Sequence, residues 1–343
     1  MEDSIIKKVR IKKIISQTEV AKSFILEPLG WKAEWASGQF ITLVFYTPHG
    51  EKRRSFSISS SPELGEPLTI TIKRLENGEF SRWMIHDATE GEILFTSGIS
   101  GFFVLPHKKE NITLIYFAAG SGINPCFPAI KTALKTTSNE IFLFYSNKSI
   151  EQTIFYQEIL FLEKQYPSRF RLRWFFSNNN EISKKRLSHS ILEEILLNLI
   201  KVEKNFRLYI CGPYLYTSTI NITARAFGIL PENIVREDFY PLPRLIIPKP
   251  PDINEHTVTI LINGKEFTIK VQYPNSITKA ARKLHIELPY SCETGRCGSC
   301  VATCISGKIW MAYNEVLLDE EIEKGRVLTC VGFPYGGDAV IKY

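Results

Sequence analysis

The sequence predicts a multidomain protein with an antiparallel β-barrel first, a parallel-sheet α/β domain second and a small α+β domain last. Three observations predict it. Short β-prone runs broken by Gly and Pro come first, apolar runs that alternate with helix-like stretches follow, and a proline-rich segment then leads into a β-hairpin pattern. A chain of 343 residues has room for two or three domains. We expect domains at 1–106, 107–242 and 255–343, with a linker at 243–254.

The first domain is predicted from its strand patterns. Residues 39–45 form a strongly β-prone run, and residues 68–73 alternate apolar and polar side chains. Such alternation indicates a strand with one buried face. Several short strands separated by turn residues favour an all-β barrel.

The second domain is predicted from continuous apolar runs with a helix-like stretch at 191–199 among them. Strands that are apolar on both faces are typical of a parallel sheet covered by helices on both sides. The runs that we expect to form its strands are 112–119, 141–145, 170–176 and 206–211.

Proline marks the boundary to the third domain. Five prolines lie within residues 241–251, and proline propagates neither a helix nor a central strand, so we expect a semi-rigid linker. Beyond it, the runs 258–262 and 267–271 flank Asn263-Gly264, a preferred turn of two-residue β-hairpins.

Composition and charge exclude several classes of protein. No stretch approaches the ~18 apolar residues of a membrane helix, and the N-terminus lacks a signal-peptide pattern, so we expect a cytoplasmic protein without membrane insertion. The net charge of +6 lies in residues 1–252, because residues 253–343 carry equal numbers of acidic and basic side chains. A basic front portion suits anionic cofactors such as dinucleotides. Nucleic-acid binding is not expected, because no tight Lys/Arg cluster with interleaved aromatic residues stands out.

The clearest chemical signal is a set of four cysteines. Cys292, Cys297 and Cys300 follow the spacing C-x4-C-x2-C, and Cys330 comes after 29 intervening residues. This is the spacing of a plant-type [2Fe–2S] cluster, in which we expect a short loop to supply three thiolates and a distant strand the fourth. A zinc site would more often show two Cys-x2-Cys pairs. A redox Cys-x-x-Cys motif would not need the other two cysteines.

Residues 255–343 resemble a plant-type ferredoxin domain of β-grasp fold, and residues 325–330 have the ending typical of such domains fused to reductases. The resemblance implies that the four cysteines are the iron ligands. Cys304 follows soon after Cys300, and we expect it to be a small apolar residue packed beneath the loop. The acidic run 319–323 is expected to be a solvated helix start, with docking of a partner as a second use.

Arg54, Phe56 and Ser57 lie in one predicted strand and offer the groups that a flavin needs. These groups are a cation for the pyrophosphate, a planar apolar surface for the ring, and a donor near N5. Arg54 and Phe56 share one face of the strand, and Ser57 lies at the bend between faces. The pattern alone is weak, because a surface arginine beside a core phenylalanine occurs in many strands.

Further segments strengthen the flavin hypothesis. The order Arg-x-aromatic-Ser, Ile-Lys-Arg, Gly-x-x-Ser resembles the FAD domain of the ferredoxin–NADP⁺ reductase superfamily. Residues 91–94 and 98–103 resemble the closing strands of that barrel, with Gly-Ile-Ser-Gly where relatives carry Gly-Pro-x-Gly. We expect a helix that opens at Ser81 and offers its N-terminus and hydroxyl to the pyrophosphate. The residues that the resemblance assigns to FAD are Arg54, Phe56, Ser57, Ile72, Lys73, Arg74, Gly78, Phe80 and Ser81.

A Gly-Ser-Gly segment directly follows the first predicted parallel strand. Glycines there permit a tight turn and the close approach of a phosphate, and the helix that follows presents free N–H groups to it. The segment resembles the pyrophosphate loop of the same superfamily, with Asn124 in place of Thr or Ala. A later Cys-Gly-Pro resembles the family segment whose cysteine lies near the nicotinamide. The residues that the resemblance assigns to NAD(P)H are Gly120, Ser121, Gly122, Ile123, Pro125, Cys211, Gly212 and Pro213.

Residues 237–239 match a Glu-x-Phe segment of the same superfamily. The resemblance implies that Phe239 covers or borders the flavin and that Glu237 lies near its reactive edge. Ser57, Cys211 and Glu237 are then implied to position or tune the reacting rings, without acting as covalent catalysts.

The choice between NADH and NADPH stays open. A 2′-phosphate calls for Arg or Lys, whereas NAD calls for a neutral or acidic contact. Asn178 stands where many NADPH-using relatives have Arg. Basic residues elsewhere in the domain could compensate, namely Lys148, Lys184, Lys185 or Arg186.

The resemblance covers essentially the whole chain, in the order FAD barrel, NAD(P) domain, ferredoxin domain. That order matches the reductase components of bacterial oxygenase systems, including the phenylacetyl-CoA epoxidase reductase and ketosteroid hydroxylase reductase groups. It implies an NAD(P)H-dependent oxidoreductase that passes electrons through FAD and the [2Fe–2S] cluster to an external oxygenase or other electron-accepting protein. A general flavodoxin or cytochrome reductase is the alternative enzyme. A redox-sensing module is remote, because it does not need a flavin strand and a nicotinamide loop together.

Overall fold

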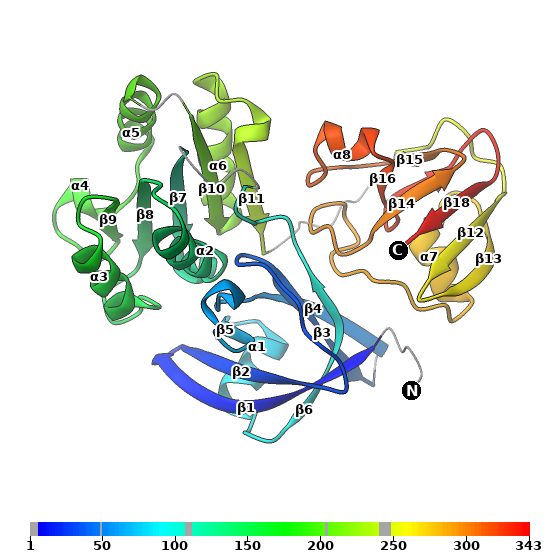
Figure 1. The fold of residues 1–343 in the computed structure, drawn as a ribbon, viewed down its shortest axis with the longest axis horizontal. Helices are drawn as coiled ribbons and strands as arrows, with labels where there is room; N and C mark the ends of the chain where they lie inside the picture. Colours follow the sequence, from blue (N-terminus) through cyan, green and yellow to red (C-terminus); the bar gives the residue numbers. More distant parts are fainter. Residues whose placement is uncertain (1–5, 49, 107–111, 203–204, 240–247) are drawn as a thin grey trace.

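The computed structural model describes residues 6–48, 50–106, 112–202, 205–239 and 248–343. Figure 1 shows three units, each built on its own sheet, with the first below, the second at the upper left and the third at the right. The predicted succession of a β-barrel, an α/β unit and an α+β unit is confirmed. The boundaries predicted near residues 107 and 242, and residues 243–247 of the predicted linker, lie outside the described residues.

The first unit is a six-stranded antiparallel barrel with the strand order β4-β3-β6-β1-β2-β5. A bridge between Ile58, which follows β4, and Ile70 on β5 joins the two ends of this order. Inward-facing side chains such as Val9, Phe24 and Leu43 are fully buried in its core. The elements are β1 (Lys7–Thr18), β2 (Ala21–Leu29), β3 (Phe40–Thr47), β4 (Gly50–Ser57), η1 (Pro62–Leu64), β5 (Thr69–Lys73), α1 (Glu79–His86) and β6 (Ile93–Ser100).

Two details of this unit differ from the prediction. The segments expected as separate closing strands, 91–94 and 98–103, contribute the two ends of a single strand, β6. The helix α1 begins at Glu79 and not at Ser81. The Ser81 hydroxyl donates to the backbone oxygen of Gly78 at 3.2 Å, so Ser81 closes the first turn from within the helix.

The second unit is a five-stranded parallel sheet with the order β11-β10-β7-β8-β9. Tyr116 and Leu143 pack on the side covered by α2 and α3, whereas Ile115 and Phe117 pack on the side covered by α5 and α6. The predicted doubly covered parallel sheet is therefore confirmed. The elements are β7 (Thr113–Ala119), η2 (Gly120–Gly122), α2 (Ile123–Thr136), β8 (Ile141–Asn147), α3 (Tyr156–Gln165), β9 (Phe170–Phe176), α4 (Ile182–Lys185), α5 (His189–Val202), β10 (Phe206–Gly212), α6 (Tyr214–Ala226), η3 (Pro231–Asn233) and β11 (Ile234–Asp238).

The third unit is a mixed sheet with the order β13-β12-β18-β14-β16, in which only β12 and β18 run parallel among the neighbouring pairs that the structure describes. The predicted hairpin is present, and its turn residues Asn263 and Gly264 have φ of +50° and +71°, as a type I′ turn requires. The elements are β12 (His256–Ile262), β13 (Lys265–Val271), α7 (Ile277–Lys283), β14 (Val301–Ser306), β15 (Ile309–Met311), α8 (Asp319–Glu323), β16 (Arg326–Leu328), β17 (Gly332–Pro334) and β18 (Ala339–Lys342).

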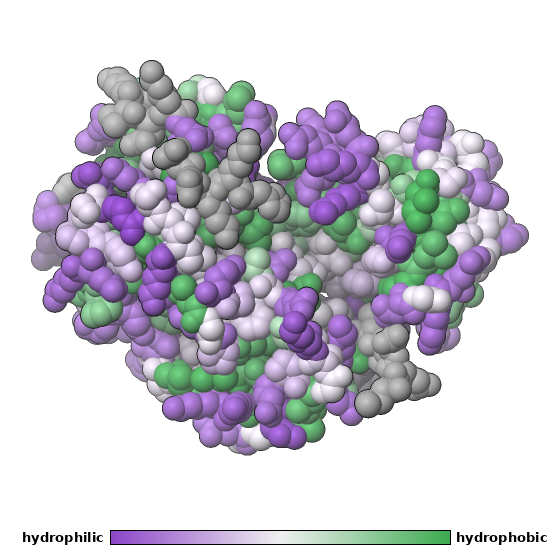
Figure 2. Space-filling view, in the orientation of Figure 1, coloured by the Kyte–Doolittle hydropathy of each residue, from purple (hydrophilic) through white to green (hydrophobic). Residues whose placement is uncertain are grey.

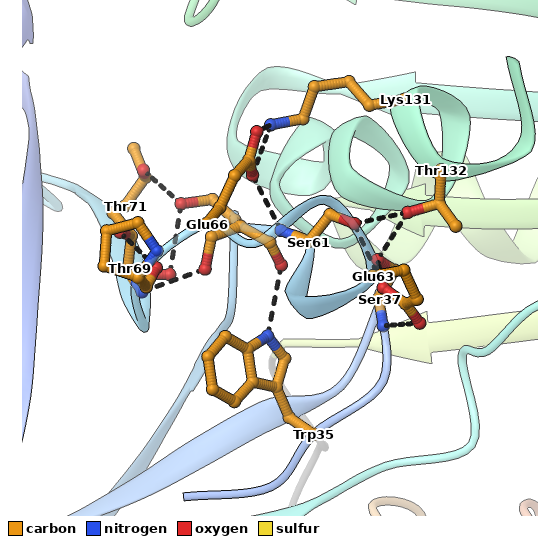
Figure 3. A network of polar contacts seen from close by, with 12 residues as sticks. Trp35, Ser37, Ser61, Glu63, Glu66, Thr69, Thr71, Lys131 and Thr132 are labelled. Carbon is orange, nitrogen blue, oxygen red and sulfur yellow. Dashed lines mark hydrogen bonds and ion pairs between the residues drawn. The ribbon is translucent and has the colours of Figure 1, made fainter. Parts of the chain in front are cut away.

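A buried polar network joins the first two units (Figure 3). The Thr132 hydroxyl on α2 shares hydrogen bonds with the hydroxyls of Ser37, at 2.8 Å, and Ser61, at 2.6 Å. Both serines also donate to Oε2 of Glu63, at 2.7 and 3.0 Å. These contacts fix α2, and with it the loop that precedes α2, relative to the barrel.

None of the helices that the structure describes has the length and apolar character to cross a membrane.

Candidate redox site

The Gly-Ser-Gly segment lies at the carboxyl end of β7. Its three residues form one 3₁₀ turn that leads directly into α2. Gly120 has φ of +54°, and a Cβ on Gly122 would lie 2.1 Å from the backbone oxygen of Cys211, so only glycine allows this approach to β10. Ser121 lies within the turn, and Ile123 and Pro125 are buried in the first turn of α2. A helix N-terminus behind a close-packed glycine turn is a suitable site for a pyrophosphate.

Cys211 lies at the end of β10, beside this turn. It is fully buried and pairs in register with Ala118 on β7 and with Glu237 on β11. Burial, with the nearby Glu237 carboxyl adding to it, raises the pKa of the Cys211 thiol well above its usual value. Gly212 ends the strand, and Pro213 precedes α6. Cys211 is therefore a neutral thiol near the carboxyl end of β10, an inner strand of the sheet.

Glu237 connects the second unit to the barrel. Part of the residue is accessible, but its carboxyl group is buried, and the Ser57 hydroxyl donates to Oε1 at 2.7 Å. Burial raises the pKa of Glu237 to about 8, the Ser57 hydrogen bond acts against this rise, and the Asp238 carboxylate adds to it. Oε2 is buried without a hydrogen-bond partner among the described residues. A carboxyl group that is largely protonated at neutral pH therefore stands beside Ser57, with one oxygen available to a bound group.

The predicted flavin strand, β4, brings Arg54 and Phe80 together. Arg54 is exposed, and its guanidinium lies 5.3 Å from the centre of the Phe80 ring, which stacks on Phe45 at 4.1 Å. Phe56 is half-buried on the same strand. A cation beside an aromatic face on an accessible strand suits the pyrophosphate and ring of a flavin.

Other residues assigned to the flavin lie in different surroundings. Ile72 is buried in the barrel core, and Arg74 contacts His86 near the surface. Gly78 is required beside Ser81, because a Cβ there would lie 2.3 Å from the Ser81 Oγ. Lys73 Nζ lies 3.7 Å from the position that a Cβ on Gly120 would occupy. Lys73 therefore borders the predicted nicotinamide loop.

A cavity of about 970 Å³ lies where the three units meet. Figure 2 shows that this face of the molecule is indented between the second and third units, with mainly hydrophilic residues along the rim. All three units supply predicted site residues to the cavity wall, which includes Arg54, Glu237, Phe239, Cys292 and Cys297. The cavity therefore brings Arg54, Glu237 and Phe239 of the predicted flavin site and two predicted cluster ligands into one space.

The four cysteines predicted as iron ligands converge within the third unit. Hydrogen bonds with Cys297 and Cys330 lower the pKa of Cys292, and the same contacts raise the pKa values of Cys297 and Cys330. Cys330 also contacts Cys300, so the four thiols share one small volume. Among the described residues, no group of three or more His, Cys, Asp or Glu side chains is arranged to hold a single metal ion. The fourth thiol was expected on a strand, but Cys330 lies in the turn between β16 and β17. A two-iron cluster spreads its ligands over two metals, and four convergent thiols, three on one loop and one in this turn, fit it.

The loop that carries three of the cysteines depends on left-handed backbone. Gly295 and Gly298 both have φ of +76°. A Cβ on Gly295 would lie 2.8 Å from the backbone oxygen of Tyr313, and one on Gly298 would lie 2.4 Å from the ring of Phe102. The backbone N–H of Thr294 donates to the Cys292 sulfur at 3.4 Å. Glycine is thus needed both to fold the loop and to seat it on the first unit.

Cys304 lies outside the cluster of thiols. It lies on β14, where its thiol donates to the backbone oxygens of Ser306 and Gly307 at 3.4 and 3.7 Å. It packs against the sheet core around Ile260, and not beneath the loop as expected. The acidic run 319–323 forms the short helix α8 without buried residues, which fits the expected solvated helix start.

Sequence patterns did not identify the residues that dock the third unit. Phe102, which follows β6, packs against the core around Tyr290 and Cys330. Arg236 on β11 forms an ion pair with Glu315 at 3.0 Å. Neither residue belongs to a spacing motif, so only their neighbours in space reveal these contacts.

Two family models match the chain. The 2Fe-2S iron-sulfur cluster binding domain matches residues 260–335, and the oxidoreductase NAD-binding domain matches residues 117–219. Among curated proteins, the chain is 28% identical to a subunit of the 1,2-phenylacetyl-CoA epoxidase of Escherichia coli, over 97% of this chain and 96% of that protein. It is 26% identical to the ferredoxin reductase component of 3-ketosteroid-9-alpha-monooxygenase of Mycolicibacterium smegmatis, over 98% of this chain and 96% of that protein. Among solved structures, phthalate dioxygenase reductase matches with a TM-score of 0.57 at 22% identity, over 98% of both chains.

The fold and the matched domains define an oxidoreductase that combines an NAD-binding domain with a [2Fe–2S] domain. The three-unit arrangement is that of phthalate dioxygenase reductase. The chain thus carries an oxidoreductase NAD-binding domain followed by a 2Fe-2S iron-sulfur cluster binding domain, and over nearly its whole length it is similar to reductase components of oxygenase systems.

Proposed function

We propose that this chain is the reductase component of an oxygenase system and passes electrons from NAD(P)H through FAD and a [2Fe–2S] cluster to an external oxygenase. The observation that carries the proposal is the shared cavity, because Arg54, Glu237 and two cluster cysteines line it and Ser57 donates to Glu237 from the barrel. Relatives named as components of a CoA-ester epoxidase and a ketosteroid monooxygenase match nearly the whole chain. The partner is accordingly a ring-hydroxylating or CoA-ester oxygenase, and the site of action is the cytoplasm.

FAD and the cluster supply the redox chemistry, in which a pair of electrons from NAD(P)H is passed on one at a time. The residues of the chain hold and orient these groups. Arg54 would neutralise the flavin pyrophosphate, and Phe56 and Phe80 would provide apolar surface near it. The turn at residues 120–122 and the N-terminus of α2 would hold the nicotinamide dinucleotide. Cys292, Cys297, Cys300 and Cys330 would hold the irons.

The flavin ring and the nicotinamide ring would meet between the Ser57–Glu237 pair and the thiol of Cys211. Ser57 donates to Glu237, whose second carboxyl oxygen is buried and without a partner among the described residues. Because Glu237 is largely protonated near neutral pH, it can donate as well as accept a hydrogen bond there. The neutral Cys211 thiol adds no charge beside the nicotinamide ring.

The test uses Cys297→Ser, with Cys304→Ser as the matched control. Anaerobic NAD(P)H should bleach both the flavin and the cluster absorption of the wild-type protein. Cys297→Ser should abolish reduction of a one-electron acceptor such as cytochrome c, yet leave reduction of a dye that takes electrons from the flavin. Cys304→Ser should behave as wild type, because Cys304 lies outside the cluster of thiols.

Two results would contradict the proposal. Equal loss of both activities in Cys297→Ser would show that the cluster is not the exit for electrons. A wild-type protein whose flavin bleaches while the cluster stays oxidised would show the same. If the two-cofactor path holds but no oxygenase accepts the electrons, the chain is a general flavodoxin or cytochrome reductase.

A further inference from the structure

Arg53, the neighbour of the predicted flavin arginine, is buried between the first and third units. Only 3% of its side chain is exposed. Its Nε donates to Oε1 of Glu51 at 2.6 Å, and its Nη1 donates to the backbone oxygens of Leu288 and Tyr290 at 3.2 and 3.4 Å. The guanidinium also lies 3.9 Å from the centre of the Tyr290 ring. A charged group thus connects β4 to the backbone just before Cys292.

The other partners of Tyr290 complete a compact assembly. Arg282 on α7 donates to the Tyr290 hydroxyl at 3.1 Å and to Glu293 at 2.8 Å, and the Tyr290 hydroxyl donates to Oε1 of Glu51 at 3.3 Å. We call Glu51, Arg53, Arg282, Tyr290 and Glu293 the tyrosine clamp. It has two residues from the barrel and three from the third unit, so it exists only while the two units are docked.

The clamp lies directly beside the predicted electron path. Ser291, between Tyr290 and Cys292, shares a hydrogen bond of 2.7 Å with Ser55 on β4. Successive side chains of a strand point to opposite faces, so Arg53 and Arg54 point to opposite faces of β4. Arg54 lines the cavity together with Cys292, and Arg53, which also lines part of the cavity wall, places its guanidinium in the clamp. One short strand therefore carries both the flavin residues and the attachment of the cluster loop.

We propose that Arg53 is a positioning residue that docks the cluster loop against the flavin strand and so sets the rate of electron transfer from flavin to cluster. The inference rests on the proposed function. Arginine suits this task because its planar fork donates in several directions while its face stacks on an aromatic ring. Lysine can place a charge there but cannot reproduce both the fork and the stack.

The experiment uses the full-length protein loaded with FAD and cluster. Arg53→Ala should leave the visible spectra of both groups and the rate of dye reduction unchanged. It should lower the rate of cluster reduction by NAD(P)H, measured anaerobically by stopped flow, by about tenfold or more, the change that about 1.4 kcal/mol of lost docking produces. Arg53→Lys should restore part of the rate. Arg10→Ala, which removes an exposed ion pair with Glu27 elsewhere in the barrel, is the matched control and should behave as wild type.

Docking is measured separately by amide hydrogen exchange in the oxidised protein. Peptides covering residues 50–57 and 286–293 should exchange faster in Arg53→Ala by a similar factor, and at the wild-type rate in Arg10→Ala. Unchanged exchange and unchanged cluster reduction in Arg53→Ala would overturn the proposal. An equal fall of dye and cluster reduction would also overturn it, because Arg53 would then act on the flavin site itself.

The failure of the proposed function gives a different result. A wild-type protein whose cluster is never reduced by NAD(P)H would overturn the proposed function and with it the electron-transfer role of Arg53. The exchange rates would still show whether Arg53 docks the third unit.

Discussion

The buried carboxyl group of Glu237 lowers the stability of the fold and also offers a polar atom to a bound molecule. Its carboxyl group accepts one hydrogen bond from Ser57, and its second oxygen has no partner among the described residues. Burial raises the pKa of Glu237 to about 8, so the folded protein holds a proton that an unfolded chain releases near pH 4.5. A group held in this way at the junction of two units is a candidate for a site that a bound molecule completes.

The raised pKa of Glu237 predicts how stability depends on pH. Between pH 4.5 and about 8 the unfolded carboxyl is ionised and the folded one is protonated, so this group lowers the free energy of unfolding as pH rises through that window. Glu237→Gln cannot ionise. It should therefore gain stability relative to wild type from pH 5 to pH 8, on the order of 3 kcal/mol in total, since each pKa unit corresponds to about 1.4 kcal/mol.

Urea unfolding at a series of pH values, with FAD in constant excess, measures this difference. Glu76→Gln on the exposed surface is the control and should follow the wild-type curve. If Glu237→Gln and wild type differ by a constant amount at every pH, the carboxyl is already ionised in the folded protein at neutral pH.

At the scale of elements, α2 has two tasks. Its N-terminus follows the glycine turn of the predicted nicotinamide loop, and its middle docks on the barrel through Thr132. The hydroxyls of Ser37 and Ser61 are buried with that of Thr132 and depend on it for part of their hydrogen bonding. The same helix therefore places the loop and fixes its orientation relative to the flavin strand.

Thr132→Val should destabilise the protein by about 1–3 kcal/mol, because it leaves buried hydroxyls without one of their partners while the side-chain volume hardly changes. Thr136→Val is the matched control. Thr136 lies one turn later on α2, is exposed, and donates only within the helix, to the backbone oxygen of Thr132. Its replacement should cost less than about 0.5 kcal/mol.

Denaturant unfolding followed by tryptophan fluorescence compares the two variants. The affinity for NAD(P)H should also fall in Thr132→Val, because α2 loses its anchor on the barrel. Equal destabilisation by the two variants would mean that the network around Thr132 adds nothing beyond helix propensity.

At the scale of the whole molecule, the three units surround one cavity and are joined by contacts of two kinds. Arg53 docks the third unit through a buried guanidinium, whereas the ion pair between Arg236 and Glu315 is partly open to solvent, with side-chain exposures of 22% and 29%. Salt screens exposed charges far more than buried ones. The two kinds of contact should therefore respond differently to ionic strength.

Electron transfer within the wild-type protein should be nearly independent of salt. Between 0.1 and 1 M NaCl the Debye length falls from about 10 Å to about 3 Å, which weakens the pair of Arg236 and Glu315 but hardly affects Arg53. The rate of cluster reduction, divided by the rate of dye reduction in the same buffer, should change less than about twofold. In Arg53→Ala the same ratio should fall by about fivefold or more, because docking then depends on the exposed pair. A steep fall in the wild type would show that the exposed pairs hold the third unit in place.

Much of the fold follows from local sequence. The apolar runs of the second unit and the alternation at residues 68–73 place strands correctly, because burial of one or both faces imposes a period that can be recognised within a few residues. The Asn263-Gly264 turn is local for the same reason. The four cysteines can be recognised because ligation of a cluster constrains spacing along the chain.

Other features depend on partners far away in the sequence. Ser81 is a residue type that often begins a helix, yet Gly78 is the residue that precedes the first turn of α1. The Ser81 hydroxyl donates back to the Gly78 backbone oxygen from inside the helix. The Arg-x-aromatic-Ser pattern singles out Arg54, but nothing in the sequence assigns a role to Arg53. Only the packing of β4 against Tyr290 shows that Arg53 is buried at the junction with the third unit.

The sequence by itself determined the order of the three units, the strands that build them and the four thiols of the cluster domain, since each depends on residues close together in the chain. Only the tertiary structure decided which groups meet: Ser57 with Glu237, Thr132 with Ser61, and Arg53 with Tyr290. The two residues in each of these contacts are separated by between 71 and more than 200 positions in the sequence. Their free energy comes from burial and geometry that no local pattern records.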